Sequence, residues 1–250
     1  MKLHSIIGTM TAVLILSLSL GGYLYYSTLR KDALDETSRR AAFEISHTHR
    51  TIDTFLASYL KAASALGRLE DIRQVFGHRG TDSFEKVNIA LDLFRDTFGA
   101  SVCFLMDIRG NTLAATNRDG PGSFVGKNYA FRPYFQKALP GESGLYMALG
   151  VTSGERGVYY SCPVYNENAA DPSGVVVIKS AIDPLEHALL DQGTGVWGLT
   201  GPHGVIFASN QKEWLYNTLW KIDPDQMNAI AATRQFGKGP WRWTGMEPAG

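Results

Sequence analysis

A lysine inside an apolar run is the residue whose position most strongly suggests ligand binding. Lys179 stands in VVVIKSAI (175–182), which otherwise has the pattern of a buried β-strand. Because burying an unpaired ammonium group is costly, this side chain needs either a route to solvent or a negatively charged partner. A local acid such as Asp183 could be that partner, and so could an anionic ligand. The sequence leaves both interpretations open.

An arginine at the start of a short helix is the second candidate. Arg132 directly precedes Pro133, a residue that suits the first turn of a helix. At such a position, free backbone N–H groups and the helix dipole favour anions, and a guanidinium can bind a carboxylate through two hydrogen bonds. Tyr129 lies three residues earlier and could add a hydroxyl. The alternative is an arginine that lies in solvent on a loop.

Hydroxyl groups lie in a loop and on the strand that follows it. Residues 150–154 (GVTSG) carry Thr152 and Ser153, and Tyr159 and Ser161 share one face of the next strand. The sequence does not say whether this face looks inward. Two cations and several hydroxyls around one pocket would suit a small dianion, with each charge-assisted hydrogen bond contributing about 1.5–3 kcal/mol.

Other classes of protein fit the sequence poorly. We find no nucleophile–base–acid spacing and no phosphate-binding loop, so we expect no catalytic residues, no cofactor and no enzymatic activity within these 250 residues. His47 and His49 do not share a helix face, which argues against a metal site. With 24 basic and 24 acidic residues, the chain has no net charge, and we expect no nucleic-acid binding.

The first 29 residues predict a membrane anchor. No charged residue occurs from Ser5 to Leu29, a run longer than the roughly 20 residues that span a bilayer core. Tyr23, Tyr25 and Tyr26 cluster at its far end, where aromatic rings favour the headgroup layer. The alternative is a signal peptide that is cleaved near residues 19–21. Either interpretation predicts that most of the chain is exported.

Residues 30–99 predict a long helix followed by a second one. Apolar residues recur at helical spacing from Ile45 to Leu66, and the first evident breaks are Gly77 and Gly80. A second helix is expected from Asp82, capped by Glu85, to Gly99. The apolar stripe either packs onto the following domain or also forms a parallel dimer contact.

The remainder predicts an α+β fold in two modules. In residues 100–193 we expect a five-stranded antiparallel sheet flanked by helices. Its strands are expected at 101–107, 112–116, 145–149, 158–165 and 175–181, with helices at 131–139 and 184–192. Residues 194–250 repeat the order hairpin then helix, with strands at 196–200 and 205–209, and would form an incomplete second module.

Four stretches resemble a known family. They are NYAFRPYFQKAL (128–139), ALGVTSGERGVYYS (148–161), GVVVIKSAIDPLE (174–186) and HGVIFASNQKEWLYNTL (203–219). They are similar to the periplasmic sensor region of C4-dicarboxylate sensor histidine kinases of the DctB type. That region is a tandem PAS-like (PDC, double Cache) domain, and the resemblance therefore implies two such modules after the long helix.

The resemblance also implies a role for each candidate residue. The membrane-distal module would bind succinate, fumarate or malate, with Tyr129 and Arg132 at one end of the diacid and Lys179 at the other. Thr152 and Ser153 would supply loop contacts, and Tyr159 and Ser161 would point inward. Related amino-acid sensors tend to carry an aspartate near the position of Lys179, so a lysine there favours a second negative group.

The same resemblance bears on the two cysteines. Cys103 is expected on the first strand and Cys162 on the fourth. In the PAS strand order that the resemblance implies, the fifth strand separates them. We therefore expect no disulfide between them, although an exported domain lies in an oxidising compartment.

These observations predict a sensor protein of the bacterial inner membrane, with one N-terminal span and a periplasmic sensor region. Its expected partners are a small dicarboxylate, the membrane and a second copy bound through the N-terminal helix. Alternatives are a chemoreceptor-like sensor of another small anion or amino acid, and a membrane-tethered interaction protein with a vestigial pocket. No kinase-core motif is present, which fits either a fragment of a kinase or a stand-alone sensor.

Overall fold

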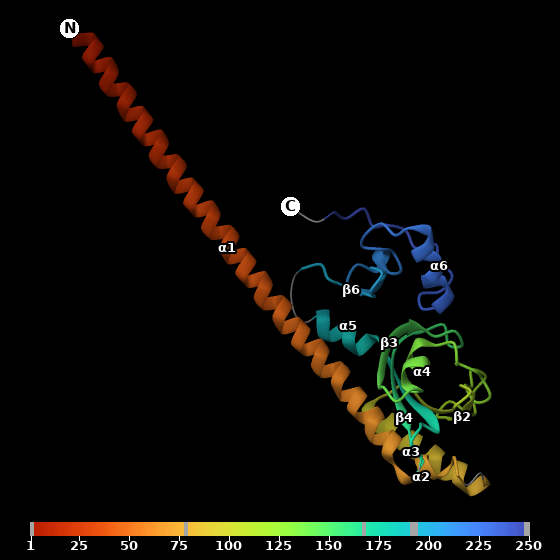
Figure 1. The fold of residues 1–250 in the computed structure, drawn as a ribbon. Helices are drawn as coiled ribbons and strands as arrows, with labels where there is room; N and C mark the ends of the chain where they lie inside the picture. Colours follow the sequence, from red (N-terminus) through yellow and green to blue (C-terminus); the bar gives the residue numbers. More distant parts are fainter. Residues whose placement is uncertain (1–2, 78–79, 167–168, 191–194, 248–250) are drawn as a thin grey trace. The chain divides into compact units, whose positions relative to one another are not determined.

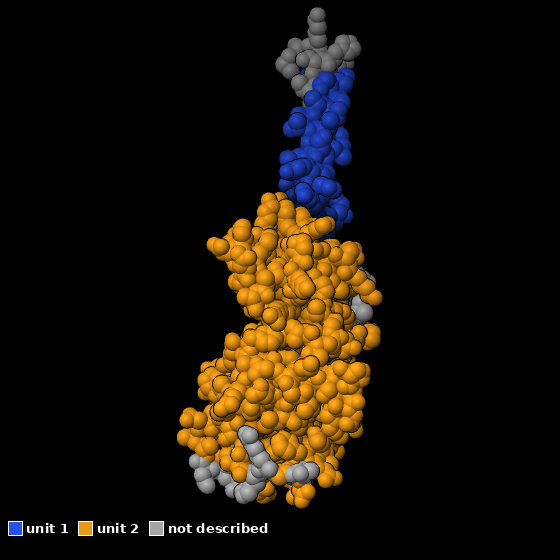
Figure 2. Space-filling view, turned by 90° about the vertical axis from the view of Figure 1, so that its right-hand side faces the viewer, with its two compact units in different colours: residues 1–50 blue, residues 51–250 orange. Residues whose placement is uncertain are grey.

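The chain folds into two compact units, which comprise residues 1–50 and 51–250. This computed structural model describes residues 3–77, 80–166, 169–190 and 195–247 (Figure 1). Figure 2 colours the two units separately. The division falls within the first helix, α1 (Leu3–Arg68), so all strands and the later helices belong to the second unit.

The first unit consists of the N-terminal part of α1. Its apolar side chains are exposed, among them Leu14, Leu16 and Tyr25 at 60%, 72% and 69%. Within the described residues, α1 is the single helix that is long and apolar enough to cross a membrane. A hydrophobic surface of this kind needs an apolar environment, which is consistent with the predicted anchor.

The helices of the second unit differ from the prediction at two of their ends. The chain leaves the helical conformation at Leu69 (φ −61°, ψ 140°), before the expected break at Gly77, and continues into α2 (Glu70–Gln74). The predicted capping box at Asp82 and Glu85 is wrong, because α3 (Thr81–Phe98) begins after Gly80 without a side-chain cap. Gly99 (φ +62°) ends α3 as predicted, in the left-handed conformation that glycine tolerates.

The predicted α+β fold with a five-stranded antiparallel sheet is confirmed (Figure 1). The strands are β1 (Val102–Asp107), β2 (Thr112–Ala115), β3 (Gly144–Leu149), β4 (Arg156–Val164) and β5 (Gly174–Ala181). Their spatial order is β2-β1-β5-β4-β3, so β5 is central. Cys103 on β1 and Cys162 on β4 lie on either side of β5, and both thiols are free and buried.

Both faces of this sheet are covered, which explains why β5 is buried from Gly174 to Ser180 and apolar at most positions. Leu105, Tyr160 and Ile178 belong to the core that the sheet forms with α1 and α3. Phe104 and Tyr159 belong to a second core, which includes residues of α4 (Pro133–Ala138). Because side chains alternate along a strand, Tyr159 and Tyr160 lie on opposite faces.

The C-terminal elements form a smaller group. They are α5 (Asp183–Leu190), β6 (Gly198–Thr200), β7 (Ile206–Ser209), the 3-10 helix η1 (Lys212–Trp214) and α6 (Pro224–Thr233). The predicted end of α5 at Gln192 lies outside the described residues. Strands β6 and β7 pair as the expected hairpin. A capping box between Asp223 and Gln226 starts α6.

Hydrogen bonds join the five-stranded sheet to these C-terminal elements. The Leu149 N–H at the end of β3 donates to the Gln235 carbonyl (2.8 Å), and the Gln235 side chain donates to the Met147 carbonyl (2.6 Å). Arg156 on β4 donates to the Phe207 carbonyl on β7 (2.9 Å). A shift of β3 and β4 would therefore strain these hydrogen bonds or move the C-terminal elements with the strands.

Candidate functional site

Arg132 is placed by the start of α4. It is the N-cap residue (φ −77°, ψ 132°), and Pro133 occupies the first helical turn, as the sequence predicts. Its side chain is nevertheless buried rather than solvated, with 1% of the residue exposed. One terminal nitrogen donates to the Leu149 carbonyl (2.8 Å), and the other to the carbonyls of Arg234 (3.3 Å) and Thr233 (3.5 Å).

Carbonyl groups, not carboxylates, thus surround the Arg132 guanidinium. The carbonyls of Thr233 and Arg234 lie at the C-terminal end of α6, where the helix dipole is negative. The Arg132 guanidinium also lies 5.4 Å from the centre of the Phe131 ring. The guanidinium of Arg234 lies 5.2 Å from the centre of the same ring. Among the described residues, no acid forms an ion pair with Arg132.

Lys179 is placed by the central strand. On β5 it pairs with Tyr159 of β4, and 1% of its surface is exposed. Its Nζ donates to Ser153 Oγ (3.0 Å) and lies 5.9 Å from the centre of the Tyr159 ring. The nearest acid is Glu155, with Oε2 at 3.7 Å and a side chain that is 74% exposed. The acid suggested by the sequence, Asp183, is not the partner of this lysine.

Burial and the charge of Glu155 act on the pKa of Lys179 in opposite directions. Burial lowers the pKa of Lys179 below its ordinary value of 10.5, because the charged form loses hydration. The carboxylate of Glu155 raises this pKa, but the effect of burial is the larger of the two. An anion that reached Nζ would stabilise the charged form, so the site is electrostatically suited to one.

The hydroxyl groups divide into two sets. Tyr129 Oη and Thr152 Oγ1 are hydrogen bonded to each other at 2.8 Å. Burial raises the pKa of Tyr159 to about 12 and also raises that of Tyr129, so both hydroxyls stay neutral near pH 7 and can donate. Ser161 is already engaged, because its Oγ donates to the carbonyl of Tyr134 (2.9 Å).

A small cavity of ≈ 10 Å³ lies among these residues. Its lining includes four predicted residues, Tyr129, Arg132, Thr152 and Tyr159, together with Phe124, Tyr134, Gly150 and Val151. Ser153 and Lys179 are next to lining residues, because Ser153 follows Thr152 in the chain and Lys179 pairs with Tyr159 across the sheet. Ser161 does not line the cavity. The space suffices for about one water molecule, so a larger ligand requires the 150–155 loop to move.

Two features of the site were not predicted from the sequence. Glu155 follows Ser153 in the same loop, and an acid so close to a proposed anion site could have been noted from its position alone. The backbone carbonyls that hold Arg132 have no sequence signature, since they belong to Leu149, Thr233 and Arg234. They meet Arg132 because β3 and the end of α6 are neighbours in the fold.

The chain is similar to two curated proteins, although no family model matches it. It is 31% identical over 158 residues to the C4-dicarboxylate transport sensor protein DctB of Rhizobium meliloti, covering 63% of this chain and 25% of that protein. It is 28% identical over 198 residues to the protein of the same name from Pseudomonas aeruginosa, covering 73% and 31%. The chain thus spans about a quarter to a third of the length of these relatives.

Solved structures show the same likeness. The sensor domain of the V. cholerae histidine kinase DctB matches with a TM-score of 0.75 and 28% identity, covering 83% of this chain and 80% of that one. The ligand-binding domain of the Campylobacter jejuni chemoreceptor Tlp3 shares the fold, with a TM-score of 0.56 and 19% identity over 75% and 74%. In sequence and in fold, over most of its length, this chain is similar to the sensor region of DctB-type proteins.

Proposed function

We propose that this chain is the ligand-binding part of a membrane-anchored sensor that faces the periplasm of a bacterial cell. Its ligand would be a C4-dicarboxylate such as succinate, fumarate or malate. The names of both curated relatives support this class of ligand. The apolar N-terminal part of α1 supports the anchor.

The observation that carries the proposal is the pair of buried cations beside one cavity. Arg132 and Lys179 each have 1% of their surface exposed, and no buried carboxylate contacts either of them within the described residues. Glu155, the nearest acid, is largely in solvent and compensates Lys179 weakly. A ligand with two carboxylates would supply both missing charges.

Binding would require a rearrangement, because the cavity holds about one water molecule. We infer that the loop of residues 150–155 opens, and that one ligand carboxylate takes the place of Glu155 beside Lys179. The other carboxylate would attract the Arg132 guanidinium away from the carbonyls at the end of α6. Ligand binding would thereby loosen the contact between the sheet and the C-terminal elements, shifting the population between two arrangements.

A homodimer through α1 would give this change a route toward the membrane. In support, Leu34 and Ile45 remain exposed beyond the expected span, and because they are eleven residues apart they lie on one face of the helix. Two copies packed in parallel would bury them. Disulfide cross-linking of an Ile45→Cys variant in membranes tests this arrangement, and a monomer in both the presence and absence of succinate would contradict it.

Calorimetric titration of the full chain in detergent tests the ligand assignment. Succinate, fumarate and malate should bind, and neutral amino acids should bind at least tenfold more weakly. Lys179→Gln and Arg132→Lys should each weaken succinate binding about tenfold or more, as expected for a lost charge-assisted hydrogen bond. Lys137→Gln, which removes an exposed lysine of α4, is the matched control and should bind normally.

The outcome that would contradict the assignment is equally specific. Unchanged succinate affinity in both Lys179→Gln and Arg132→Lys would exclude this pocket as the binding site. Circular dichroism should be recorded for each variant, because Arg132 also holds three backbone carbonyls. The lysine at position 132 keeps the positive charge and so limits the structural damage.

A further inference from the structure

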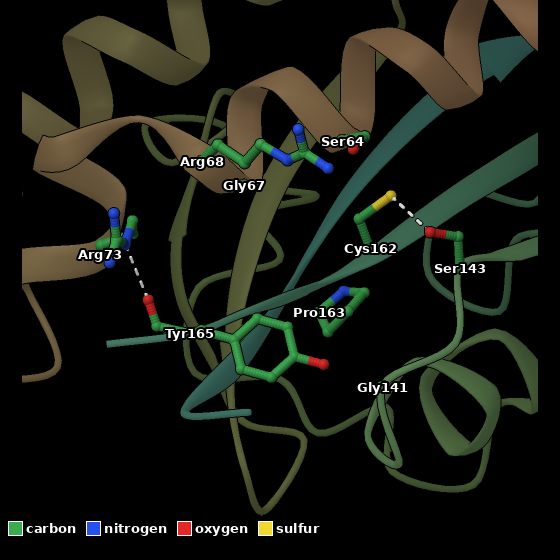
Figure 3. A pocket seen from close by; sticks show the side chains of 9 residues that line it. All are labelled: Ser64, Gly67, Arg68, Arg73, Gly141, Ser143, Cys162, Pro163 and Tyr165. Atoms are coloured by element: carbon green, nitrogen blue, oxygen red, sulfur yellow. Dashed lines mark hydrogen bonds between the residues drawn. The ribbon is translucent and has the colours of Figure 1, made fainter. Parts of the chain in front are cut away.

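A second, larger cavity lies away from the dicarboxylate site. It has a volume of ≈ 380 Å³ and lies between the last turns of α1, the α2 segment and the far end of β4 (Figure 3). Ser64 and Arg68 come from α1, Arg73 from α2, and Cys162 from β4. All of its lining residues belong to the second unit, so the cavity is a feature of a single compact body.

The charge of this cavity is positive. Two of its lining residues are arginines and none is acidic. Arg73 donates from Nε to the Tyr165 carbonyl (2.9 Å), which fixes the side chain, and its two terminal nitrogens donate to none of the described residues. Neither Arg68 nor Arg73 forms an ion pair with an acid that the structure describes. Two guanidinium groups that line one cavity without a counter-charge in it favour the entry of an anion.

Hydroxyl groups complete the lining. Ser64, Ser143 and Tyr165 each contribute one, and Ser143 Oγ lies 3.3 Å from Cys162 Sγ. The Tyr165 hydroxyl is held against Gly141, where a Cβ would lie 2.8 Å from it. Guanidinium forks together with hydroxyl donors are the groups that bind carboxylate and phosphate oxygens.

This cavity is separate from the dicarboxylate site. The two share no lining residue. Cys162 belongs to the core on the α1 side of the sheet, whereas Tyr159 belongs to the core on the α4 side. The second cavity lies near the C-terminal end of β4, at Cys162 and Pro163, whereas Tyr159 lies near the middle of this strand.

We propose that this cavity is a second binding site, for a small oxyanion that carries carboxylate or phosphate groups. The anion would bridge Arg68 at the end of α1 and Arg73 on α2, with the hydroxyls of Ser143 and Tyr165 as further donors. Such a bridge would tie the end of α1 to β4 and the loop before β3. The site would thus give the protein a second input that acts on α1 independently of the dicarboxylate pocket.

Thermal unfolding and calorimetry of the full chain in detergent test this proposal. The Lys179→Gln background weakens binding at the dicarboxylate pocket, and the arginine variants described next separate the remaining binding there from binding at the second cavity. Inorganic phosphate and succinate are titrated separately, with sodium chloride holding the ionic strength constant, because salt alone screens charges. We expect saturable stabilisation by at least one of the two, and the more effective titrant identifies phosphate or carboxylate as the preferred group.

Arginine variants in the same background locate the site. Arg68→Gln and Arg73→Gln should each weaken the binding about tenfold or more. Arg68→Gln is the cleaner variant, because Arg68 donates no hydrogen bond to a described residue that the substitution would break. Arg109→Gln removes the same charge from an exposed turn and should bind as the background does.

Two results would overturn the proposal. One is the absence of saturable stabilisation by either anion, and the other is equal affinity in Arg68→Gln, Arg73→Gln and the background. Neither result depends on the dicarboxylate assignment, which is judged by succinate binding to the chain with an intact Lys179.

Discussion

Arg132 and Lys179 are both buried cations, but they are compensated in different ways. Arg132 donates to three backbone carbonyls, which offset its lost hydration without neutralising its charge. Lys179 has the hydroxyl of Ser153 and an exposed carboxylate at 3.7 Å. An ion pair with a largely exposed partner contributes little stability. Lys179 is therefore the less compensated of the two, and we expect it to bind a ligand carboxylate more strongly than Arg132 does.

Replacing Glu155 should tighten succinate binding, because its carboxylate competes with the ligand for Lys179. We expect Glu155→Gln to raise the affinity about two- to fivefold, the range given by the energy of an exposed ion pair. Calorimetry at neutral pH measures this change. Glu85→Gln, which removes an exposed acid of α3, serves as the control. Weaker binding in Glu155→Gln would show that the carboxylate supports the site.

Succinate binding should weaken as the pH rises through the pKa of Lys179. This pKa is lower in the folded protein than its ordinary value of 10.5, so the free protein loses this proton earlier than the unfolded chain does. In that window, the unfolded chain binds more protons, and the free energy of unfolding attributable to Lys179 increases with pH. A bound anion should raise the pKa of Lys179, so that Lys179 takes up a proton when the anion binds.

Calorimetry in buffers of different ionisation enthalpy detects this proton uptake. The uptake should be absent in Lys179→Gln, in which no group titrates at this position. Uptake of the same size in this variant would assign the proton to another residue.

Among the elements, α6 connects the site to the C-terminal part of the chain. The capping box of Asp223 and Gln226 begins it, and Arg234 ends it in a left-handed conformation (φ +51°). The carbonyls at this end accept from Arg132. The stability of α6 therefore bears directly on how firmly the buried guanidinium is held.

Removing the cap of α6 should destabilise the protein. We expect Asp223→Ala to lower the free energy of unfolding by about 0.5–2 kcal/mol, because the side chain accepts from the Gln226 N–H at 2.7 Å. Asp223→Asn keeps an acceptor at the cap and should cost clearly less. Denaturant unfolding followed by circular dichroism makes the comparison, and equal stability of the two variants would contradict it.

The elements also show where local sequence signals suffice. The strands were predicted well, because runs such as VVVIKSAI are apolar, β-branched and bounded by turn residues. The break at Leu69 is not predicted, because leucine favours helices and a single glycine, Gly67, is tolerated within a helical pattern. Packing accounts for the end of α1 at this position, because Gly67 lies close to Val176 and Pro163 of the sheet, and Ile72 on α2 is buried.

At the scale of the whole molecule, residues 51–250 should be independent of the membrane anchor. The residues of both hydrophobic cores lie after Thr51, so this unit retains its core without the preceding residues. We expect residues 51–250, expressed alone, to unfold cooperatively and to bind succinate. The full chain should remain with membranes after carbonate extraction, whereas residues 51–250 should be released. Loss of cooperative unfolding would show that the first unit is needed for stability.

The sequence by itself determined the class of the fold, the apolar segment and the choice of Arg132 and Lys179 as the candidate ligand contacts. These follow from local patterns: hydrophobic periodicity, turn residues, and a charge where apolar residues are expected. Only the tertiary structure decided what surrounds each cation. The carbonyls around Arg132, the carboxylate of Glu155 near Lys179 and the cavity that Arg68 and Arg73 line together with Cys162 join segments that are distant in sequence or depend on loop geometry. Their physical origin is packing across the sheet, which no local pattern encodes.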